Sequence, residues 1–205
     1  MNTSDPIVIV SCARTAMGGL QGDFSPVTAS ELGGVAIKAA LERGGVSADD
    51  IDEVIMGNVL PAGQGQAPAR QAAWHAGIPR SAGATTINKM CGSGMKAVMF
   101  AHDTLSAGSA DVMVVGGMES MTNAPFLLPK MRGGHKYGHD VVYDHMALDG
   151  LEDAYEKGRS LGTFAEATAA KYGFTRQAQD DYAITSPTRA QNAPTAGHFA
   201  DATTP

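Results

Sequence analysis

Cys91 is the residue whose type and surroundings best suit covalent chemistry. It lies in the segment Asn-Lys-Met-Cys-Gly-Ser-Gly-Met, residues 88–95, where a strand-like run gives way to a helical pattern. A helix N-terminus carries unpaired N–H groups and a partial positive charge, and both favour the nucleophilic thiolate over the thiol. The small residues at 92–94 would let a substrate approach the sulfur closely. A nucleophile is therefore favoured by the neighbours, although the position alone equally suits a cysteine packed as a small apolar side chain.

Cys12 is the second of the chain's two cysteines, and it also follows an apolar run. Nothing around it suggests activation, so we expect Cys12 to have a packing role. Two cysteines are too few for a disulfide framework, which favours a reducing compartment. We expect no metal site.

The composition and charge of the whole chain limit its partners. The 205 residues are 43% hydrophobic and 18% charged, with a net charge of -6, and no basic stripe indicates a nucleic-acid partner. The N-terminus lacks a basic region ahead of a long apolar run, and no stretch approaches the ~18 apolar residues of a membrane helix. We therefore expect a cytoplasmic protein that binds neither nucleic acid nor membrane.

The sequence predicts alternating strands and helices, and these elements must position Cys91. A β-branched run at 6–11 predicts a buried strand, and a T-x-x-E capping box at Thr28 begins a helix that the glycines at 44 and 45 end. Further strands are expected at 53–60, 84–90 and 111–116, and helices at 66–75 and 91–107. This order predicts the α/β class, with a mainly parallel sheet and covering helices. Ligands of such sheets bind at the carboxyl ends of the strands, where Cys91 would lie.

The amino-acid composition of the sequence changes after Gly117. Turns, scattered prolines and glycines and three of the six histidines fill residues 118–160, which predicts an inserted loop subdomain. We therefore divide the chain into a core domain, 1–117, and a second part, 118–205, that holds this subdomain and two closing helices. These helices are expected near 162–172 and from Thr175 onward. Pro187 should cost the last helix ~3 kcal/mol or kink it, and Pro194 should end it.

The motif around Cys91 resembles the nucleophile motif of the thiolases, the acetyl-CoA acetyltransferase family. The shared pattern is Asn-x-x-Cys-x-Ser-Gly followed by a Met-Lys-Ala helix. The resemblance extends in order along the chain, although Ala16 replaces a proline that is usual in the family. The other matching segments are Arg14-Thr15 with Gly18, 57–71, 116–121, 149–151 and 162–166.

The resemblance implies an acyltransferase that works through an acyl-cysteine at Cys91. In thiolases the cysteine takes an acyl group from acyl-CoA, and the carbanion of a second acetyl-CoA attacks it to give 3-ketoacyl-CoA. The reverse reaction is thiolysis, as in fatty acid metabolism. Coenzyme A thioesters would be substrates, with no permanently bound cofactor. Leu151 and Leu161 fall where thiolases line the pantetheine channel, with Leu161 replacing a usual methionine; both could instead simply pack the loop subdomain.

The resemblance also implies partners. Thiolases pair the strand before the nucleophile, here 84–90, into dimers and often assemble further into tetramers. The basic patch at 130–139, with Lys130, Arg132, His135, Lys136 and His139, falls in the region that builds those tetramers. Where direct contact with CoA phosphates is concerned, we favour a plain solvated loop over such a contact.

Several thiolase residues have no counterpart in residues 1–205. The family's second half supplies a Gly-His-Pro histidine, a Cys-x-Gly cysteine and an Asn-Glu-Ala-Phe asparagine, and none of these motifs occurs here. The helix at 91–101 is apolar almost all round, so a second core domain or a separate polypeptide would have to cover it. The alternatives are a non-catalytic half that binds CoA or assembles with a partner, and another condensing enzyme such as a ketoacyl synthase.

Overall fold

The computed structural model of the protein describes residues 6–205, and it divides into two compact units. Of the described residues, the first unit comprises 6–150 with 204–205, and the second comprises 151–203. This division rests on which parts of the backbone lie close together. The boundary predicted at residue 117 rests on amino-acid composition, and it stays a prediction.

A parallel three-stranded sheet forms the centre of the first unit. Strand β2 (Glu53–Gly57) lies between β3 (Gly83–Ile87) and β4 (Met113–Gly117). In the register of both pairs Gly57 lies opposite Ile87 and opposite Gly117, so the three strands end at one edge of the sheet. The predicted parallel α/β arrangement is present, with strands shorter than expected.

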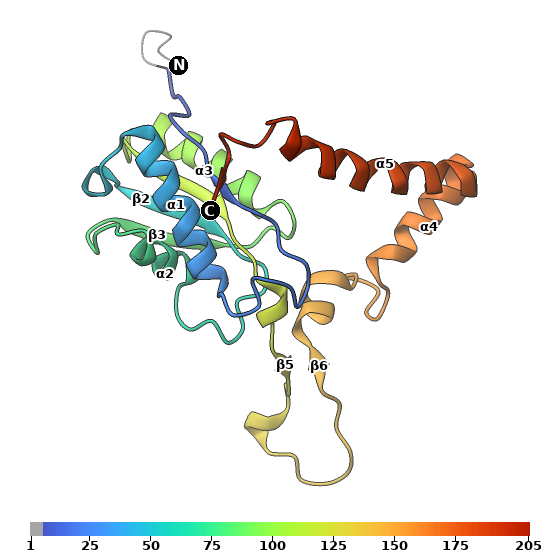
Figure 1. Ribbon diagram of the computed structural model, residues 1–205. Coiled ribbons are helices and arrows are strands. Elements are labelled where there is room, and N and C mark those ends of the chain that lie inside the picture. Colours follow the sequence, from blue (N-terminus) through green and yellow to red (C-terminus); the bar gives the residue numbers. More distant parts are fainter. Residues whose placement is uncertain (1–5) are drawn as a thin grey trace. The chain divides into compact units, whose positions relative to one another are not determined.

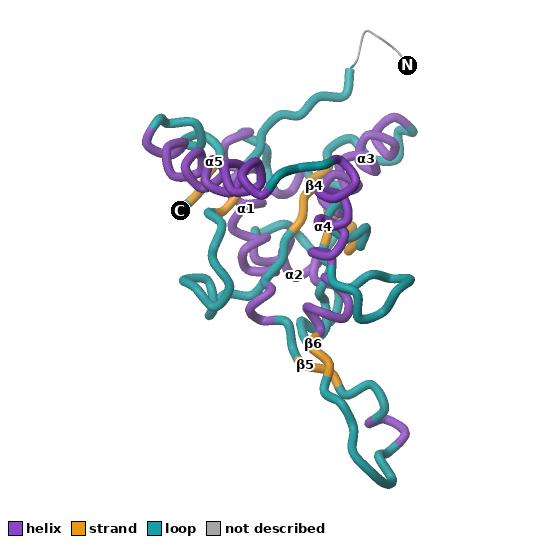
Figure 2. The backbone as a smooth tube through the Cα atoms, turned by 90° about the vertical axis from the view of Figure 1, so that its right-hand side faces the viewer, coloured by secondary structure: helices purple, strands orange, loops and turns teal. Residues whose placement is uncertain are grey.

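Helices cover both faces of this sheet. Helices α1 (Ala29–Gly44) and α2 (Pro68–His75) lie on one face, and α3 (Ser93–Ser106) lies on the other (Figures 1 and 2). The alternation along β2 explains the layers, because Val54 and Met56 join the core with α1 and α2 while Gly57 meets α3. The core is built mainly from these aliphatic and small side chains: Ala29, Ile37, Leu41, Ile51, Val54, Met56, Ala69, Ala72, Ala73, Ala76, Ile78, Ala82 and Met118.

The predicted capping box at the start of α1 is present. The Thr28 hydroxyl accepts a hydrogen bond from the Glu31 N–H at 3.2 Å, and the Glu31 carboxylate accepts one from the Thr28 N–H at 2.8 Å. The Thr28 N–H and the Thr28 hydroxyl, which donates to the same carboxylate at 2.7 Å, hold the pKa of Glu31 below its ordinary value. Gly45 ends the helix in the left-handed conformation, φ 62°, which glycine adopts without strain.

The predicted strand at 6–11 is wrong. The side chains of Ile7, Val8, Ile9 and Val10 are exposed, Ile9 to 81%, and β1 comprises only Arg14–Thr15. A β-branched run favours extended backbone, but a strand also needs a neighbour to bond, and the sheet of β3, β2 and β4 does not include this run. Cys12 is exposed too, so its predicted packing role is also wrong.

Shorter elements follow the sheet in the first unit. Strands β5 (Phe126–Leu127) and β6 (Tyr143–Asp144) pair antiparallel as the stem of a long hairpin. The single-turn helices, of the 3-10 type except the last, which is a π-helix, are Ala48–Asp50, Met121–Asn123, Met131–Gly133 and Ala147–Leu151. Strand β7 comprises Thr203–Thr204.

The second unit consists mainly of helices α4 (Leu161–Tyr172) and α5 (Arg176–Thr195). Thr175 caps α5, as its predicted start required, and the helix runs through Pro187 to end one residue after Pro194. None of residues 151–203, all of which the structure describes, is buried. This unit therefore has no core of its own. In the described residues no helix is both long and apolar enough to cross a bilayer.

Candidate functional site

Cys91 lies in the turn between β3 and α3, and it is exposed. The helix begins at Ser93 with Gly92 as its N-cap, two residues later than predicted. The sulfur is therefore neither buried nor inside a regular element. The N–H groups of Gly92 and Ser93, directly after Cys91, donate to the Lys89 and Met90 carbonyls at 3.2 and 3.0 Å.

The turn is held by hydrogen bonds on both sides of Cys91. Met90 has a positive φ of 49°, and its N–H donates to Asn88 Oδ1 at 2.9 Å. The buried Ser93 hydroxyl accepts from the Lys89 N–H at 2.8 Å and donates to the Met90 carbonyl at 2.6 Å. A non-glycine residue in the left-handed region costs about 1–3 kcal/mol, so these bonds must offset that strain to keep the turn as it is.

Glycines let the start of α3 approach the ends of the strands. A Cβ on Gly57 would lie 2.5 Å from the Ser93 Cβ and 3.0 Å from the Gly94 nitrogen. A Cβ on Gly117 would lie 3.5 Å from the Gly94 Cα, an ordinary contact. The helix that follows Cys91 therefore rests directly on the backbone at the carboxyl end of β2, which any larger residue at 57 would disturb.

Glu119 lies just after β4 and binds the loop that follows β2. Its carboxylate accepts hydrogen bonds from Asn58 Nδ2 at 2.7 Å, the Val59 N–H at 2.8 Å and the Leu60 N–H at 3.0 Å. Burial raises the pKa of the Glu119 carboxyl, and the N–H groups of Val59 and Leu60 oppose that rise. The sequence analysis included Glu119 only within a matching segment and missed this role. An acidic residue two positions after an apolar strand was the available signal.

A buried histidine holds the next part of the same loop. His145 Nε2 accepts a hydrogen bond from the Ala62 N–H at 3.3 Å, so the proton lies on Nδ1, which donates to Asp149 at 2.6 Å. The side chain of His145 is 6% exposed. His145 is one of three histidines at 118–160, and the sequence alone gave it no role.

Leu151 and Leu161 belong to the second unit, whereas Cys91 belongs to the first. Leu151 ends a π-helical turn and Leu161 begins α4, and they are 38% and 47% exposed. Between them Glu152 and Ser160 form an antiparallel bridge, so the two leucines are the next residues on either side of it. The structure thus brings the two predicted pocket residues to one end of a short closed loop, with both side chains accessible.

The outer face of α3 is apolar and exposed, as predicted. Met95 is 68% exposed, Met99 55% and Val98 45%, whereas Ala97 and Ala101 are buried against the sheet. An apolar helix face of this kind indicates a surface that another part of the protein or a partner covers.

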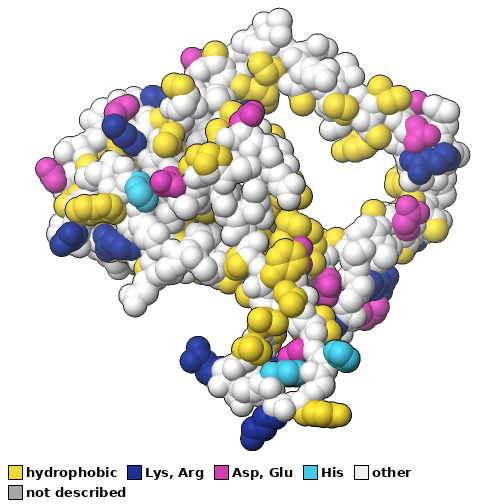
Figure 3. All heavy atoms as spheres, turned by 60° about the horizontal axis from the view of Figure 1, so that its bottom comes forward, with side chains coloured by type: hydrophobic (Ala, Val, Ile, Leu, Met, Phe, Trp, Pro, Cys, Tyr) yellow, Lys and Arg dark blue, Asp and Glu magenta, His cyan; other side chains and the backbone are white. Residues whose placement is uncertain are grey.

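The basic residues of the predicted patch lie at the tip of the β5–β6 hairpin. Figure 3 shows cationic and histidine side chains around this tip and apolar ones along its stem. His135 lies 3.3 Å from Asp140 within the hairpin itself. The described residues hold no group of three or more His, Cys, Asp or Glu side chains that could bind a metal ion.

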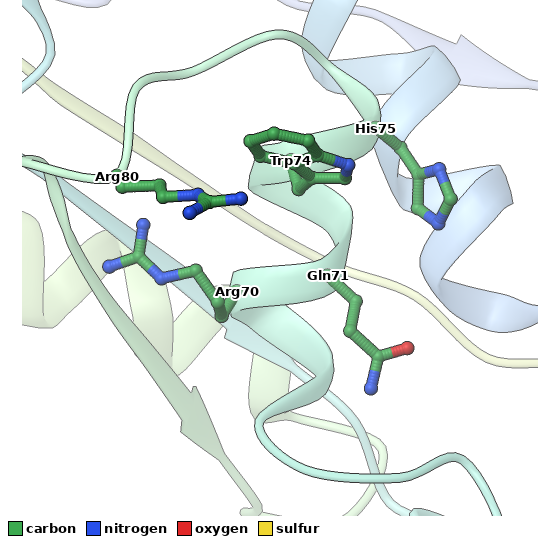
Figure 4. A pocket seen from close by; sticks show the side chains of 5 residues that line it. All are labelled: Arg70, Gln71, Trp74, His75 and Arg80. Atoms are coloured by element: carbon green, nitrogen blue, oxygen red, sulfur yellow. The ribbon is translucent and has the colours of Figure 1, made fainter.

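A shallow pocket of about 440 Å³ opens on α2, apart from the predicted site residues. It is lined by Arg70, Gln71, Trp74, His75 and Arg80 (Figure 4). The Arg80 guanidinium stacks 4.8 Å from the centre of the Trp74 ring, and Arg70 donates to the Ala82 carbonyl. These contacts are within the protein and occupy the polar groups on that side of the pocket.

Comparison with known proteins identifies relatives along almost the whole chain. The family model described as the thiolase N-terminal domain matches residues 7–205. The acetyl-CoA acetyltransferase of Cupriavidus necator is 51% identical over 193 residues, which are 94% of this chain and 49% of that protein. The cytosolic acetyl-CoA acetyltransferase of Gibberella zeae is 47% identical over 96% of this chain and 49% of its own length. Mitochondrial acetyl-CoA acetyltransferase B of Xenopus laevis is 49% identical over 99% and 48%.

A solved structure supports the same relationship. The Acat5 thiolase from Ascaris suum, crystallised in complex with coenzyme A, matches with a TM-score of 0.91 and 38% identity over 96% of this chain and 51% of its own. This likeness confirms the predicted fold class, a thiolase-like α/β half. The chain spans about half the length of the relatives that it matches.

Proposed function

Because this chain belongs to the thiolase family, we propose that it carries the nucleophile of an acyltransferase and that this nucleophile is Cys91. The exposure of Cys91 in the turn that opens α3 is the observation that supports this role most directly. A sulfur at that point can meet a thioester carbonyl without any rearrangement of the sheet. The names of the relatives, acetyl-CoA acetyltransferases, supply the substrate class.

The proposed reaction has two steps. First, the Cys91 thiolate attacks the carbonyl carbon of an acyl-CoA, and coenzyme A leaves as its thiolate to give S-acyl-Cys91. Second, the carbanion formed by removing a methyl proton of acetyl-CoA attacks the acyl carbon, and 3-ketoacyl-CoA leaves as the Cys91 thiolate re-forms. Thiolysis is the same sequence reversed, with coenzyme A as the attacking thiol. Coenzyme A enters as a substrate and is not a resident cofactor.

The accessible leucines of the second unit are proposed to contact the substrate. Leu151 and Leu161 flank one bridge and expose apolar surface, which suits the pantetheine arm of coenzyme A. The thiolase motifs that supply the base for the methyl proton and the donors to the thioester oxygen do not occur in this sequence. We infer that the rest of the protein, or a second polypeptide, supplies them.

Acetyl transfer to the sulfur tests the proposal. The chain is incubated with acetyl-CoA, digested and examined by mass spectrometry, with Cys91→Ser and Cys12→Ser as matched variants. We expect an added acetyl group on the peptide with Cys91, retained in Cys12→Ser and lost in Cys91→Ser. If the parent stays unlabelled even with a polypeptide that supplies the second half, Cys91 is not the nucleophile.

A non-catalytic half that assembles with a partner is the second candidate. The exposed apolar face of α3 favours it, because a surface of that kind calls for a covering partner. Labelling of Cys91 only in the presence of the second polypeptide would show that catalysis needs assembly. Binding of that polypeptide without any labelling would favour the non-catalytic role.

The oligomer and the compartment are also proposals. The outer edge of β3 is unpaired in the described chain and could pair with the same strand of a second copy, so we propose a homodimer or tetramer, which sedimentation would detect. The cytosolic fungal relative supports a cytoplasmic location, and fractionation would distinguish it from the mitochondrial location in the name of the Xenopus relative.

A further inference from the structure

Glu119 is the most heavily hydrogen-bonded carboxylate that the proposed reaction leaves unused. Both of its oxygens accept bonds, and the donors all belong to residues 58–60. Asn58, which is only 1% exposed, adds a further bond from its amide to the Met118 carbonyl at 3.2 Å. The end of β4 and the loop after β2 are thus fastened together at the edge of the sheet where Cys91 lies.

Two hydrogen-bonded routes connect this carboxylate to the turn that presents the sulfur. In the first, Val59 donates its N–H to Glu119 and its carbonyl accepts from Asn88 Nδ2 at 3.4 Å. In the second, Asn58 donates its side chain to Glu119 and its N–H to the Ile87 carbonyl at 3.0 Å. The first route ends at Asn88 and the second at its neighbour Ile87, and both residues come directly before the strained turn.

Asn88 connects the loop at 58–60 to Met90, the residue before Cys91. Its Oδ1 accepts the Met90 N–H at 2.9 Å, and Met90 is the residue with the positive φ. We propose that Glu119 is a positioning residue for Cys91, fixing the loop at 58–60, which through Asn88 fixes the strained turn. This role rests on the proposed function, because a fixed sulfur position matters only if the sulfur reacts.

The chain offers a matched control at the other end of the same strands. The Asp52 carboxylate accepts the Asp111 N–H at 2.7 Å and the Val112 N–H at 3.0 Å, which fastens the start of β2 to the start of β4. Asp52→Asn therefore removes a charged acceptor from the same strand pair, far along β2 from the nucleophile turn. Its effects report the general cost of loosening β2 from β4.

The test compares Glu119→Gln, Asn88→Ala, the double variant and Asp52→Asn in the full chain. Glutamine keeps the size but offers one acceptor oxygen, so it cannot accept all three donors. The readouts are hydrogen exchange of the peptide spanning 87–93 and the rate at which iodoacetamide alkylates Cys91, with the exposed Cys12 as internal reference. Neither readout requires acyl transfer.

We expect exchange of this peptide to rise about tenfold in Glu119→Gln, on the order of the loss of one bond to a charged group, and alkylation of Cys91 to slow several-fold. Asn88→Ala should reproduce both effects with the carboxylate intact, and the double variant should add little, because the two changes interrupt one connection. Asp52→Asn should leave both readouts at parent values.

Two results would overturn the proposal. One is a Glu119→Gln variant that matches Asp52→Asn, losing stability while the 87–93 peptide and Cys91 behave as in the parent. The other is full additivity of Glu119→Gln and Asn88→Ala. Acetyl labelling of the parent is measured in parallel, so a parent that is not labelled refutes the proposed function while the positioning readouts still decide the role of Glu119.

Discussion

Replacing Gly57 with alanine tests whether the nucleophile turn depends on close backbone contact. The new Cβ would lie 2.5 Å from the Ser93 Cβ and 2.9 Å from the Ser93 carbonyl carbon. A flexible side chain could move aside, but two of the three nearest atoms belong to the backbone of the first turn of α3. Either α3 lifts off the sheet or the end of β2 shifts.

The expected cost follows from that geometry. Overpacking of a rigid site costs about 1–3 kcal/mol, and a contact with backbone belongs at the upper end. With a urea m-value of about 1–3 kcal/mol/M, a loss of about 3 kcal/mol lowers the unfolding midpoint by about 1–3 M. Circular dichroism of the full chain in urea measures this shift.

Gly19→Ala is the matched control. A Cβ at Gly19 meets nothing within 4 Å, so its midpoint should stay at the parent value. If Gly57→Ala also unfolds at the parent midpoint, the close approach of α3 to β2 is not a constraint, and the account of the site given above is wrong.

Four other predictions concern caps, charge, proline and substrate contacts. Thr28→Ala removes the capping box of α1 and should cost about 1 kcal/mol in urea unfolding. Two backbone donors lower the pKa of Asp52. The stability that the Asp52 carboxylate contributes should therefore be present above the ordinary carboxyl pKa and be lost as the pH falls through the lowered pKa. The free energies of unfolding of Asp52→Asn and the parent should converge in acid. Pro187→Ala replaces a residue that costs a helix interior about 3 kcal/mol more than alanine does, which should raise the helical circular dichroism of α5. Replacing Leu151 or Leu161 with alanine should slow acetyl-CoA labelling of Cys91 but leave its iodoacetamide rate unchanged; equal slowing of both would refute a substrate contact.

The parts of the fold that local signals specify could be predicted from the sequence. Both ends of α1 were predicted correctly, because a capping box and a C-terminal glycine each act through residues only a few positions away. The placement of Cys91 between a strand and a helix was predictable for the same reason. The run at 6–11 was predicted wrongly because extended propensity does not supply a neighbouring strand.

The contacts that hold the site could not be predicted from one sequence. Glu119 binds residues about 60 positions earlier, and His145 binds Ala62 across 83 positions. Such pairs depend on the parallel register that brings the ends of β2 and β4 together, and no periodicity in the sequence encodes that register. A carboxylate after a strand is also common on protein surfaces, so its type alone gives no role.

The two compact units divide the proposed chemistry between them. The position of the sulfur is set within the first unit, by Ser93, by the glycine at 57 and by hydrogen bonds around Asn88. The proposed substrate contacts lie in the second unit, where no residue of 151–203 is buried and packing therefore cannot hold side chains rigidly. Reactivity of Cys91 toward small reagents should thus be a property of the described core. Selectivity for coenzyme A thioesters should instead depend on whatever covers the second unit and the apolar face of α3.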